Sequence, residues 1–380
     1  SAAQAEGRPL VKLNAAYELR TDELAYRILP PASPVPVTQP FMQREFFDFG
    51  AQMRVPLYTG GRVAHGVEAA AHGEVSAEAQ RETRWLDLRY RVAEEYVAVL
   101  RARDEQTVAR TYRDNLAAHL HDVEALYREG KAPKNDLLAA QVALADARHS
   151  LVAARHGLDA AIAAFNRRLG RPLDAPVSLE PLHFRPEKVD LEELTQRALA
   201  MRPELADLAA QAAALCHRSE QARAARKPQI YAEGVYGFRE NRYQDPQGIA
   251  AVRVGADWTM ADFGRTEHQA EELAWKSQAV QHQFDHLAST IRLQVRRAWL
   301  HLDETRRRLE VAEAALEQAD ENVRVTRSRY RNGLATNTDV LKAELLRVRT
   351  YRNYNHSLYD AILAMMWLKR VTATWDEPLQ

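Results

Sequence analysis

Residues 126–140 read LYREGKAPKNDLLAA, and residues 329–343 read RYRNGLATNTDVLKA. Each stretch contains a glycine, Gly130 or Gly333, that suits the left-handed backbone conformation found just after the end of a helix. An aspartate follows near the start of the next apolar-periodic stretch, where its charge suits the helix dipole. Each stretch therefore predicts a tight turn between two helices, although a role as simple helix caps explains the same residues equally well.

The two turns belong to an internal repeat with a single ungapped offset of 203 residues, from Gly130 to Gly333. The aligned positions extend over about eighty residues, which chance rarely produces. They include Gly61 with Gly264, Arg62 with Arg265, His65 with His268, Glu68 with Glu271, Tyr127 with Tyr330, Arg128 with Arg331, Asp136 with Asp339, Leu138 with Leu341 and Ala140 with Ala343. The chain is therefore predicted to be a tandem duplication, in which each half has a strand-rich part, a long helix, a tight turn and a returning helix.

The positions of the prolines predict very long helices. No proline lies between Pro56 and Pro133 or between Pro246 and Pro378, and alanine, leucine, arginine and glutamate are frequent in both stretches. A continuous helix over residues 62–128 would be about 100 Å long. Because this exceeds the usual length of a globular helix, we expect a coiled or barrel-like assembly of helices. An apolar stripe at helical spacing supports this expectation: Ile291, Val295, Trp299 and Leu302.

Four short segments alternate apolar and polar residues with a period of two: residues 10–20, 47–55, 230–239 and 252–260. This alternation is typical of strands, and the length suits a tilted strand that crosses an outer membrane. A soluble sandwich would show the same alternation, but four strands make a poor closed sheet, so several copies are expected to pool their strands. The intervening residues 21–44, rich in proline, and 240–248, which are polar, are predicted to be exposed hairpin loops.

The two faces of these strands differ in character. The outward face is expected to be apolar and to include the aromatic residues Tyr17, Tyr236 and Trp258. The inward face carries five basic and four acidic residues, namely Lys12, Arg20, Arg54, Arg239 and Arg253 with Glu18, Asp48, Glu233 and Asp257. Because the charges nearly balance, the strands predict a wide, wet pore with little charge selectivity.

Composition excludes several classes of protein. Basic and acidic residues number 52 each, which argues against a nucleic-acid partner. A single cysteine, Cys216, excludes an internal disulfide and a thiolate metal cluster. No GxSxG, P-loop, GxGxxG or HExxH motif occurs, so we expect neither an enzyme nor a cofactor. His282 and His286 have the spacing of a helical metal pair, but such a pair on an exposed helix is usually solvated.

The order and duplication of these features resemble the TolC family of outer-membrane efflux channels. The resemblance rests on VPLYTGGR (55–62) and TMADFGR (259–265), which look like the strand-to-helix junctions of the family, on the two turns, and on ARKPQIYAEGVYGF (225–238). It covers nearly the whole chain. It implies a mainly α fold with a small β part, in which duplicated long helical hairpins form an α-barrel. Four strands per chain would contribute to a trimeric, 12-stranded transmembrane β-barrel.

The resemblance also implies a function and a location. The protein would be the outer-membrane exit duct of a tripartite efflux or secretion system in a Gram-negative bacterium, with a large periplasmic part. Its partners would be two further copies of the chain, a periplasmic adaptor, an inner-membrane pump and outer-membrane lipid. The implied segments are a first strand hairpin (1–60), a first long helical hairpin (61–170), an equatorial segment between the repeats (171–227), a second strand hairpin (228–262) and a second long helical hairpin with the C-terminus (263–380).

The site residues that the resemblance implies lie at the tips of the helical hairpins. The candidates for a gate are Tyr330, Asp339, Asp136 and Lys342. The candidates for docking the adaptor are Arg128, Gly130, Arg331 and Gly333. The chain departs from well-known members at two of the tip positions, because Lys342 replaces an acid and Ala335 replaces an arginine. The electrostatics of the gate are therefore expected to differ from theirs.

The two halves differ before their strands. Residues 190–226 precede the second pair of strands and contain a predicted helix cap at Asp190 and a helix start at Pro203, whereas almost nothing precedes Pro9. An amino-terminal helical segment is therefore expected to be missing, and the sequence leaves open whether that end is lipidated. It also leaves open the exported substrate and two other functions, a soluble coiled-coil scaffold and a periplasmic metal-handling protein that uses its histidines.

Overall fold

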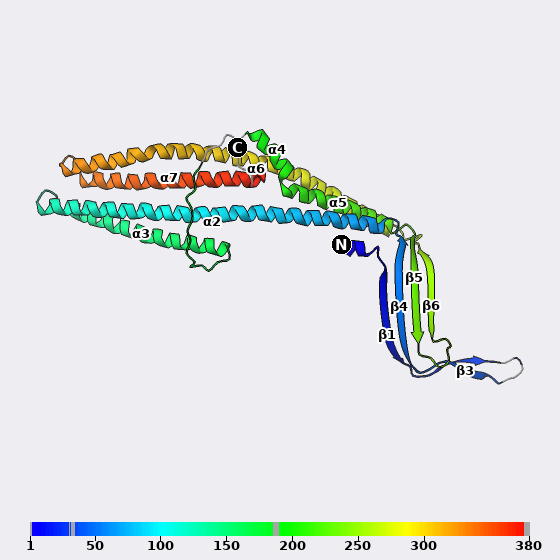
Figure 1. Ribbon diagram of the computed structural model, residues 1–380. Helices are drawn as coiled ribbons and strands as arrows, with labels where there is room; N and C mark the ends of the chain where they lie inside the picture. The colour runs from blue at the N-terminus through cyan, green and yellow to red at the C-terminus, as the bar shows by residue number, and fades with distance from the viewer. Residues whose placement is uncertain (1, 30, 32–34, 185–189, 376–380) are drawn as a thin grey trace. The chain divides into compact units, whose positions relative to one another are not determined.

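The structure is a computed structural model, and it describes residues 2–29, 31, 35–184 and 190–375. Figure 1 shows the order of the elements, with long helices in both halves of the chain and strands before each of the two longest helices. A short helix, α1 (Ala2–Ala5), precedes the first strand.

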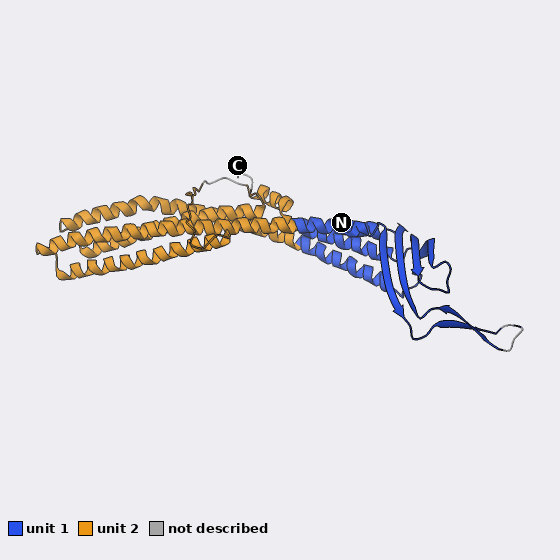
Figure 2. Ribbon diagram, turned by 60° about the horizontal axis from the view of Figure 1, so that its bottom comes forward, with its two compact units in different colours: residues 1–78, 206–285 blue, residues 79–205, 286–380 orange. Residues whose placement is uncertain are grey.

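The chain divides into two compact units, which Figure 2 shows in different colours. Unit 1 contains residues 1–78 and 206–285, and unit 2 contains residues 79–205 and 286–380. Unit 1 holds the strands and the adjoining parts of three helices, and unit 2 is built from helices. The boundaries of the units fall inside helices, so the longest helices contribute residues to both.

Unit 1 contains a four-stranded antiparallel sheet with the order β1-β4-β5-β6. Its strands are β1 (Leu10–Leu19), β4 (Glu45–Tyr58), β5 (Gln229–Arg239) and β6 (Gly248–Asp257). Strands are therefore present in all four segments predicted from the alternation, and the predicted loop between β5 and β6 is confirmed. Within the described residues, β1 and β6 are the edges of this sheet.

The register of the strands confirms the predicted faces. Val11 pairs with Met53, and further along the same face Ala232 pairs with Val254. This apolar face is exposed, and Val252 on it keeps 85% of its surface accessible. On the opposite face each of the four predicted acids has an arginine partner: Glu18 with Arg20, Asp48 with Arg239, Glu233 with Arg253 and Asp257 with Arg54. These internal ion pairs leave the face with little net charge.

The fourth strand begins and ends earlier than predicted. The alternation suggested residues 252–260, but β6 ends at Asp257, so Trp258 and Met260 lie beyond it. The Trp258 indole N–H donates to the backbone oxygen of Arg226 at 3.0 Å. This bond fixes the chain just after the β5–β6 ladder has ended. Alternation in a sequence cannot locate the last ladder bond, which depends on the partner strand.

The proline-rich segment that was predicted to be a loop contains a second, two-stranded sheet. β2 (Leu24–Ile28) pairs with β3 (Val37–Met42), and the rings of Tyr26 and Phe41 stack at 4.3 Å between their centroids. Pro40 lies next to the point at which the register shifts, where its missing N–H is tolerated. The prediction of a loop was wrong here because the ring stacking and the hairpin register are not visible in the count of prolines.

The helices follow the repeat closely. α2 (Arg62–Arg128) and α6 (Arg265–Arg331) each contain 67 residues and begin and end at equivalent positions of the two halves. The returning helices, α3 (Lys134–Arg168) and α7 (Asn337–Thr372), also begin at equivalent positions. These observations confirm the tandem duplication and the long helices predicted from the prolines.

Two shorter helices connect the halves. α4 (Leu191–Met201) begins at the predicted cap, since the Asp190 carboxylate accepts from the Glu193 N–H at 3.1 Å, and α5 (Pro203–Ala224) begins at the predicted proline. No described helix contains a stretch apolar enough, and poor enough in charge, to serve as a membrane span.

Apolar layers hold the helices of unit 2 together. One layer takes Val123 from α2, Ala140 from α3, Tyr330 from α6 and Val340 from α7. A neighbouring layer contains Leu116, Leu144 and Ala147, and a third contains Val97, Leu100, Tyr359 and Ile362. Because the first layer contains all four helices, the two hairpins share one core at this level instead of each having its own.

A buried ion-pair network joins the start of α5 to α7 inside unit 2. The Arg202 guanidinium bonds to Glu204 at 2.6 Å, and Arg370 bonds both Glu204 at 3.0 Å and Asp87 at 2.6 Å. Burial opposes ionisation of Glu204, but the hydrogen bonds and charge of Arg202, with help from Arg370, outweigh it and lower the pKa of Glu204 from 4.5 to about 2.

This pKa predicts a loss of stability in acid. Because the folded-state pKa of Glu204 is depressed, its contribution to the free energy of unfolding, about 3 kcal/mol, is present above pH 4.5 and is lost as the pH falls toward 2. We expect Glu204→Gln to lower the thermal stability at pH 7 and to approach the parent protein as the pH falls, in unfolding followed by circular dichroism. Glu192→Gln, at an exposed position of α4, is the control. An equal deficit at pH 7 and pH 3 would contradict the assignment.

Candidate functional site

Each of the predicted turns is closed by its glycine. Gly130 and Gly333 both have a φ of 71°, and their N–H groups donate to the carbonyls of Tyr127 at 3.0 Å and Tyr330 at 2.9 Å. A Cβ atom at either glycine would contact nothing within 4 Å. The glycines are therefore required for their left-handed backbone and not for space, as the sequence predicted. The two turns and the helix ends beside them are called the tip below.

The two returning helices begin in different ways. Thr336 and Asp339 form a capping box at the start of α7, in which the Asp339 carboxylate accepts from the Thr336 N–H at 2.9 Å and the Thr336 hydroxyl accepts from the Asp339 N–H at 3.2 Å. The backbone N–H of Thr336 lowers the pKa of Asp339. α3 begins after Pro133 with no side-chain cap, although Asp136 lies in its first turn. The predicted gate residue Asp339 thus has a demonstrable structural role.

Tyr330, another predicted gate residue, lies inside the tip. It is 8% exposed in the apolar layer with Val123 and Val340, and its hydroxyl has no hydrogen-bond partner among the described residues. Burial raises the pKa of Tyr330, and the charge of Asp136 raises it further. Because the Tyr330 hydroxyl already lacks a partner, a change in its surroundings would break no hydrogen bond of this group.

A buried histidine, which the sequence did not single out, joins the two repeats at the tip. His119 Nε2 lies 2.7 Å from the side-chain oxygen of Asn337, and the ring of His119 makes an edge contact with Tyr330 at 5.4 Å between centroids. The Asn337 amide also donates to the backbone oxygen of Asp136 at 3.1 Å. Burial lowers the pKa of His119, and the bond to Asn337 only partly opposes this.

A buried carboxylate lies one layer deeper and was also missed. The Glu344 side chain is 0% exposed and pairs with the Arg327 guanidinium at 2.7 Å. Arg327 also donates to the backbone oxygen of Asn115 at 3.0 Å. This polar layer therefore contains residues of α2, α6 and α7. Loss of Arg327 would leave the buried Glu344 charge without an opposite charge, which is costly.

The predicted docking residues occupy the surface of the tip. Arg331 reaches across to α2 and donates to the Asp122 carboxylate with Nε at 3.1 Å and a terminal nitrogen at 2.8 Å. Arg128 donates to the backbone oxygen of Glu124 on its own helix. Lys342 and Asp339, both predicted gate residues, line one groove of about 410 Å³ together with Ala335.

Differences between the repeats mark the residues that were missed. At the offset of the repeat, His119 corresponds to Asn322, Arg327 to Glu124, and Glu344 to Gln141. The turns themselves are alike, so a search for shared residues passes over these positions. A charged residue among the apolar positions of α7, such as Glu344, was the signal available in the sequence.

His282 and His286, the weak candidates for a metal site, lie on α6. Both are exposed, and within the described residues neither belongs to a group of three or more potential metal ligands.

Comparison with known proteins identifies the class. The profile of the family described as "Outer membrane efflux protein" matches residues 43–171 and 194–364. Two relatives from Pseudomonas aeruginosa are the alkaline protease secretion protein AprF, 23% identical over 77% of this chain and 62% of its own length, and the pyoverdine export outer membrane protein OpmQ, 25% identical over 76% and 61%. The chain thus spans less than two thirds of the length of these relatives.

A solved structure supports the fold. The outer membrane protein VceC of Vibrio cholerae superposes with a TM-score of 0.79 at 17% identity, covering 98% of this chain and 88% of that one. The chain belongs to the outer membrane efflux protein family, and its fold is the TolC-like fold that the sequence predicted. Its location is therefore the outer membrane of a Gram-negative bacterium, with a periplasmic helical part.

The buried ion pair of the tip makes a prediction that separates pairing from packing. Arg327→Leu alone would leave the buried Glu344 carboxylate without its opposite charge, with only the Asn115 amide 3.5 Å away, and should lower the free energy of unfolding by about 3–5 kcal/mol. Glu344→Leu combined with Arg327→Leu should recover most of this loss. Denaturant unfolding of the parent, the two single variants Arg327→Leu and Glu344→Leu, and the double variant measures the coupling free energy. Additive losses in the double variant would show that the two charges do not interact.

Proposed function

We propose that the protein is a passive exit duct of the outer membrane, part of a tripartite efflux or secretion system, and that it catalyses no reaction. The observation that supports this most directly is the sheet of unit 1, which has one apolar exposed face, one polar face and, in the described part of the chain, two open edges. A strand edge in lipid leaves unsatisfied backbone groups, so a four-stranded sheet of this kind requires further strands for closure.

Three copies of the chain would supply twelve strands, with β1 of one copy beside β6 of the next. The apolar face would then meet lipid, and the polar face would line the pore. Because the acids of that face are paired with arginines, the pore would be wide and without strong charge selectivity. A soluble scaffold would be expected to cover the apolar face, and the described residues leave it exposed.

The remaining segments follow from this arrangement. Residues 1–60 and 228–262 would form the membrane part, residues 61–170 and 263–380 a periplasmic tunnel, and residues 171–227 its equatorial belt. The tip would be the periplasmic entrance, with Tyr330, Asp339, Asp136 and Lys342 at the gate. A periplasmic adaptor, itself coupled to an inner-membrane pump, would dock at Arg128, Gly130, Arg331 and Gly333. This proposal is supported by the position of these residues at the turns.

The relatives carry names that point to different cargo, a protease in one case and pyoverdine in the other. We therefore assign the duct no cargo of its own and propose that the pump selects it.

Insertion and conductance test the duct. We expect the protein to require detergent for extraction, to behave as a trimer, and to conduct ions in planar bilayers. Val252→Arg, on the apolar face of β6, should reduce insertion because an arginine in the middle of the lipid-facing surface costs about 2–4 kcal/mol. Ala251→Arg, one residue away on the polar face, is the matched control and should insert normally.

Two results would overturn this proposal. The first is a monomer that stays in solution without detergent and has no conductance. The second is equal insertion of the two arginine variants, which would mean that the apolar face does not meet lipid.

We further propose that the ion pair between Arg331 and Asp122, which joins α6 to α2 at the tip, helps to hold the neighbouring gate closed in addition to the docking role of Arg331. Asp122→Arg or Arg331→Asp alone should loosen the tip and raise the conductance of the closed channel, by up to about fivefold for an exposed pair worth at most about 1 kcal/mol. The double exchange should restore the parent value because the pair is formed again in reverse. Glu321→Arg, which breaks an exposed pair within α6, is the control. Unchanged currents in both single variants would remove this pair from the gate.

A further inference from the structure

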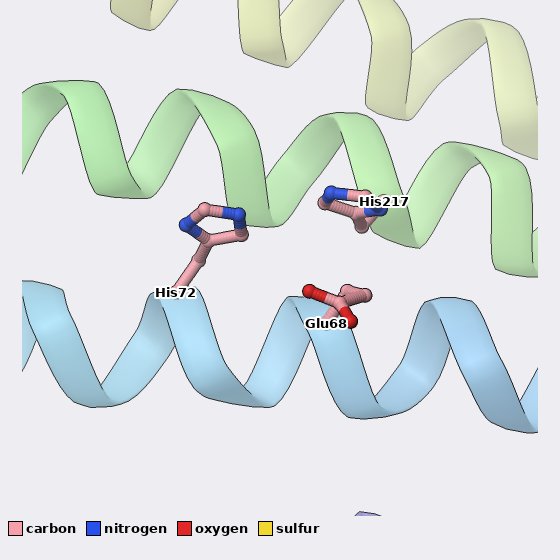
Figure 3. Close-up of side chains that lie close together, drawn as sticks. All are labelled: Glu68, His72 and His217. Atoms are coloured by element: carbon pink, nitrogen blue, oxygen red, sulfur yellow. The ribbon is translucent and has the colours of Figure 1, made fainter.

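Three potential metal ligands meet in unit 1, away from the tip. Glu68 and His72 lie one turn apart on α2, soon after the strand β4 has ended, and His217 lies on α5. Figure 3 shows the two side chains of α2 directed toward His217 on the neighbouring helix. One potential ligand atom of each residue lies within 4.8 Å of those of the other two.

The packing of α2 against α5 sets this geometry. A Cβ atom at Gly66 would lie 2.7 Å from the side-chain nitrogen of Gln221, so the two helices approach closely beside the cluster. On the other side of the cluster, the Ser76 hydroxyl donates to the Asp207 carboxylate at 2.6 Å. The cluster therefore lies between two contacts that hold the helices together.

The imidazoles of His72 and His217 lie against each other. The rings of His72 and His217 stack with their centroids 5.3 Å apart, and His65 lies beside His217 at 5.8 Å. Within the described residues, neither a hydrogen bond nor an ion pair engages Glu68, His72 or His217. Their nitrogen and oxygen lone pairs thus converge on one space that is open to solvent.

We propose that Glu68, His72 and His217 bind one divalent transition-metal ion, with Zn²⁺ as the reference ligand. Donor atoms around tetrahedral Zn²⁺ lie about 3.4 Å apart, since the metal–ligand distances are about 2.1 Å. Side-chain rotations would have to bring the present spacing, within 4.8 Å, to this value. Two imidazoles and one carboxylate form a ligand set that zinc sites use, and the fourth position is open to water or to His65.

The chemistry of the ligands sets the expected selectivity. Imidazole nitrogen favours Zn²⁺, Cu²⁺ and Ni²⁺, whereas Mg²⁺ and Ca²⁺ prefer oxygen ligands. A bound ion would join α2 to α5 inside unit 1 and would stabilise the helical segment that adjoins the sheet.

The second repeat provides an internal comparison. His268 and Glu271 are the equivalents of His65 and Glu68, and the His268 ring contacts the Glu271 carboxylate at 3.2 Å. The position equivalent to His72 is Trp275, which cannot bind a metal ion. In the described part of the chain, the cluster thus occurs in the first repeat and has no counterpart in the second.

Titration with Zn²⁺ tests the proposal on the complete, untagged protein in detergent after treatment with a chelator. We expect one Zn²⁺ per chain by elemental analysis, and a rise in Tm of roughly 2–4 °C that a chelator reverses. His72→Ala, His217→Ala and Glu68→Gln should each weaken Zn²⁺ binding at least about tenfold by calorimetry. His268→Ala and the double variant His282→Ala/His286→Ala are the matched controls and should bind as the parent does.

Each of the alternative results overturns the proposal. The proposal fails if the parent protein binds no Zn²⁺ at 100 µM, which is roughly the weakest affinity useful for a specific site. Equal binding by the parent, His72→Ala and His217→Ala would show that other histidines hold the ion. If an alanine variant does not fold by circular dichroism, His72→Gln and His217→Gln replace it, and undiminished Zn²⁺ binding by both glutamine variants has the same meaning.

Discussion

The outer edges of β1 and β6 carry backbone groups for which the described residues supply no partner strand, and the arrangement of unit 1 depends on this constraint. An N–H or C=O group left without a hydrogen bond in lipid is costly, so strands in a membrane must close on one another. Among the described residues, β4 pairs with a strand on each side, and no strand pairs with the outer edge of β1 or of β6. Its apolar face and its internally paired polar face then separate lipid from water along the same strands.

The duplication explains why the same backbone solutions occur twice. Gly61 and Gly264 have positive φ values at the entries to α2 and α6, and Gly130 and Gly333 have the same φ at their ends. Phe263 also has a positive φ at the position equivalent to Gly60, although it has a side chain. The geometry of the repeat unit is therefore retained where the residue type that favours it has been replaced.

Several polar contacts that join helices lie at positions where the repeats differ. At the tip, His119, Arg327 and Glu344 have different residues at the equivalent positions, and each contacts a helix of the other hairpin, Glu344 through the Asn115 amide at 3.5 Å. In unit 1, His72 corresponds to Trp275, and in the described part of the chain the first copy brings imidazoles of α2 and α5 together with no counterpart in the second. The two repeats thus share one backbone geometry. Residues that differ between them place different side chains at the tip and in the helices of unit 1.

The sequence by itself determined the repeat, the long helices, the two turns and the faces of the strands, because these depend on periodicity and on proline and glycine at single positions. It misplaced the end of β6 and missed the β2–β3 hairpin, because strand pairing depends on a partner distant in the chain. Only the tertiary structure decided that His119 meets Asn337, that Glu344 is buried beside Arg327, and that His72 faces His217. The residues in each of these contacts lie more than a hundred positions apart or on different helices. Such contacts follow from packing and not from local pattern.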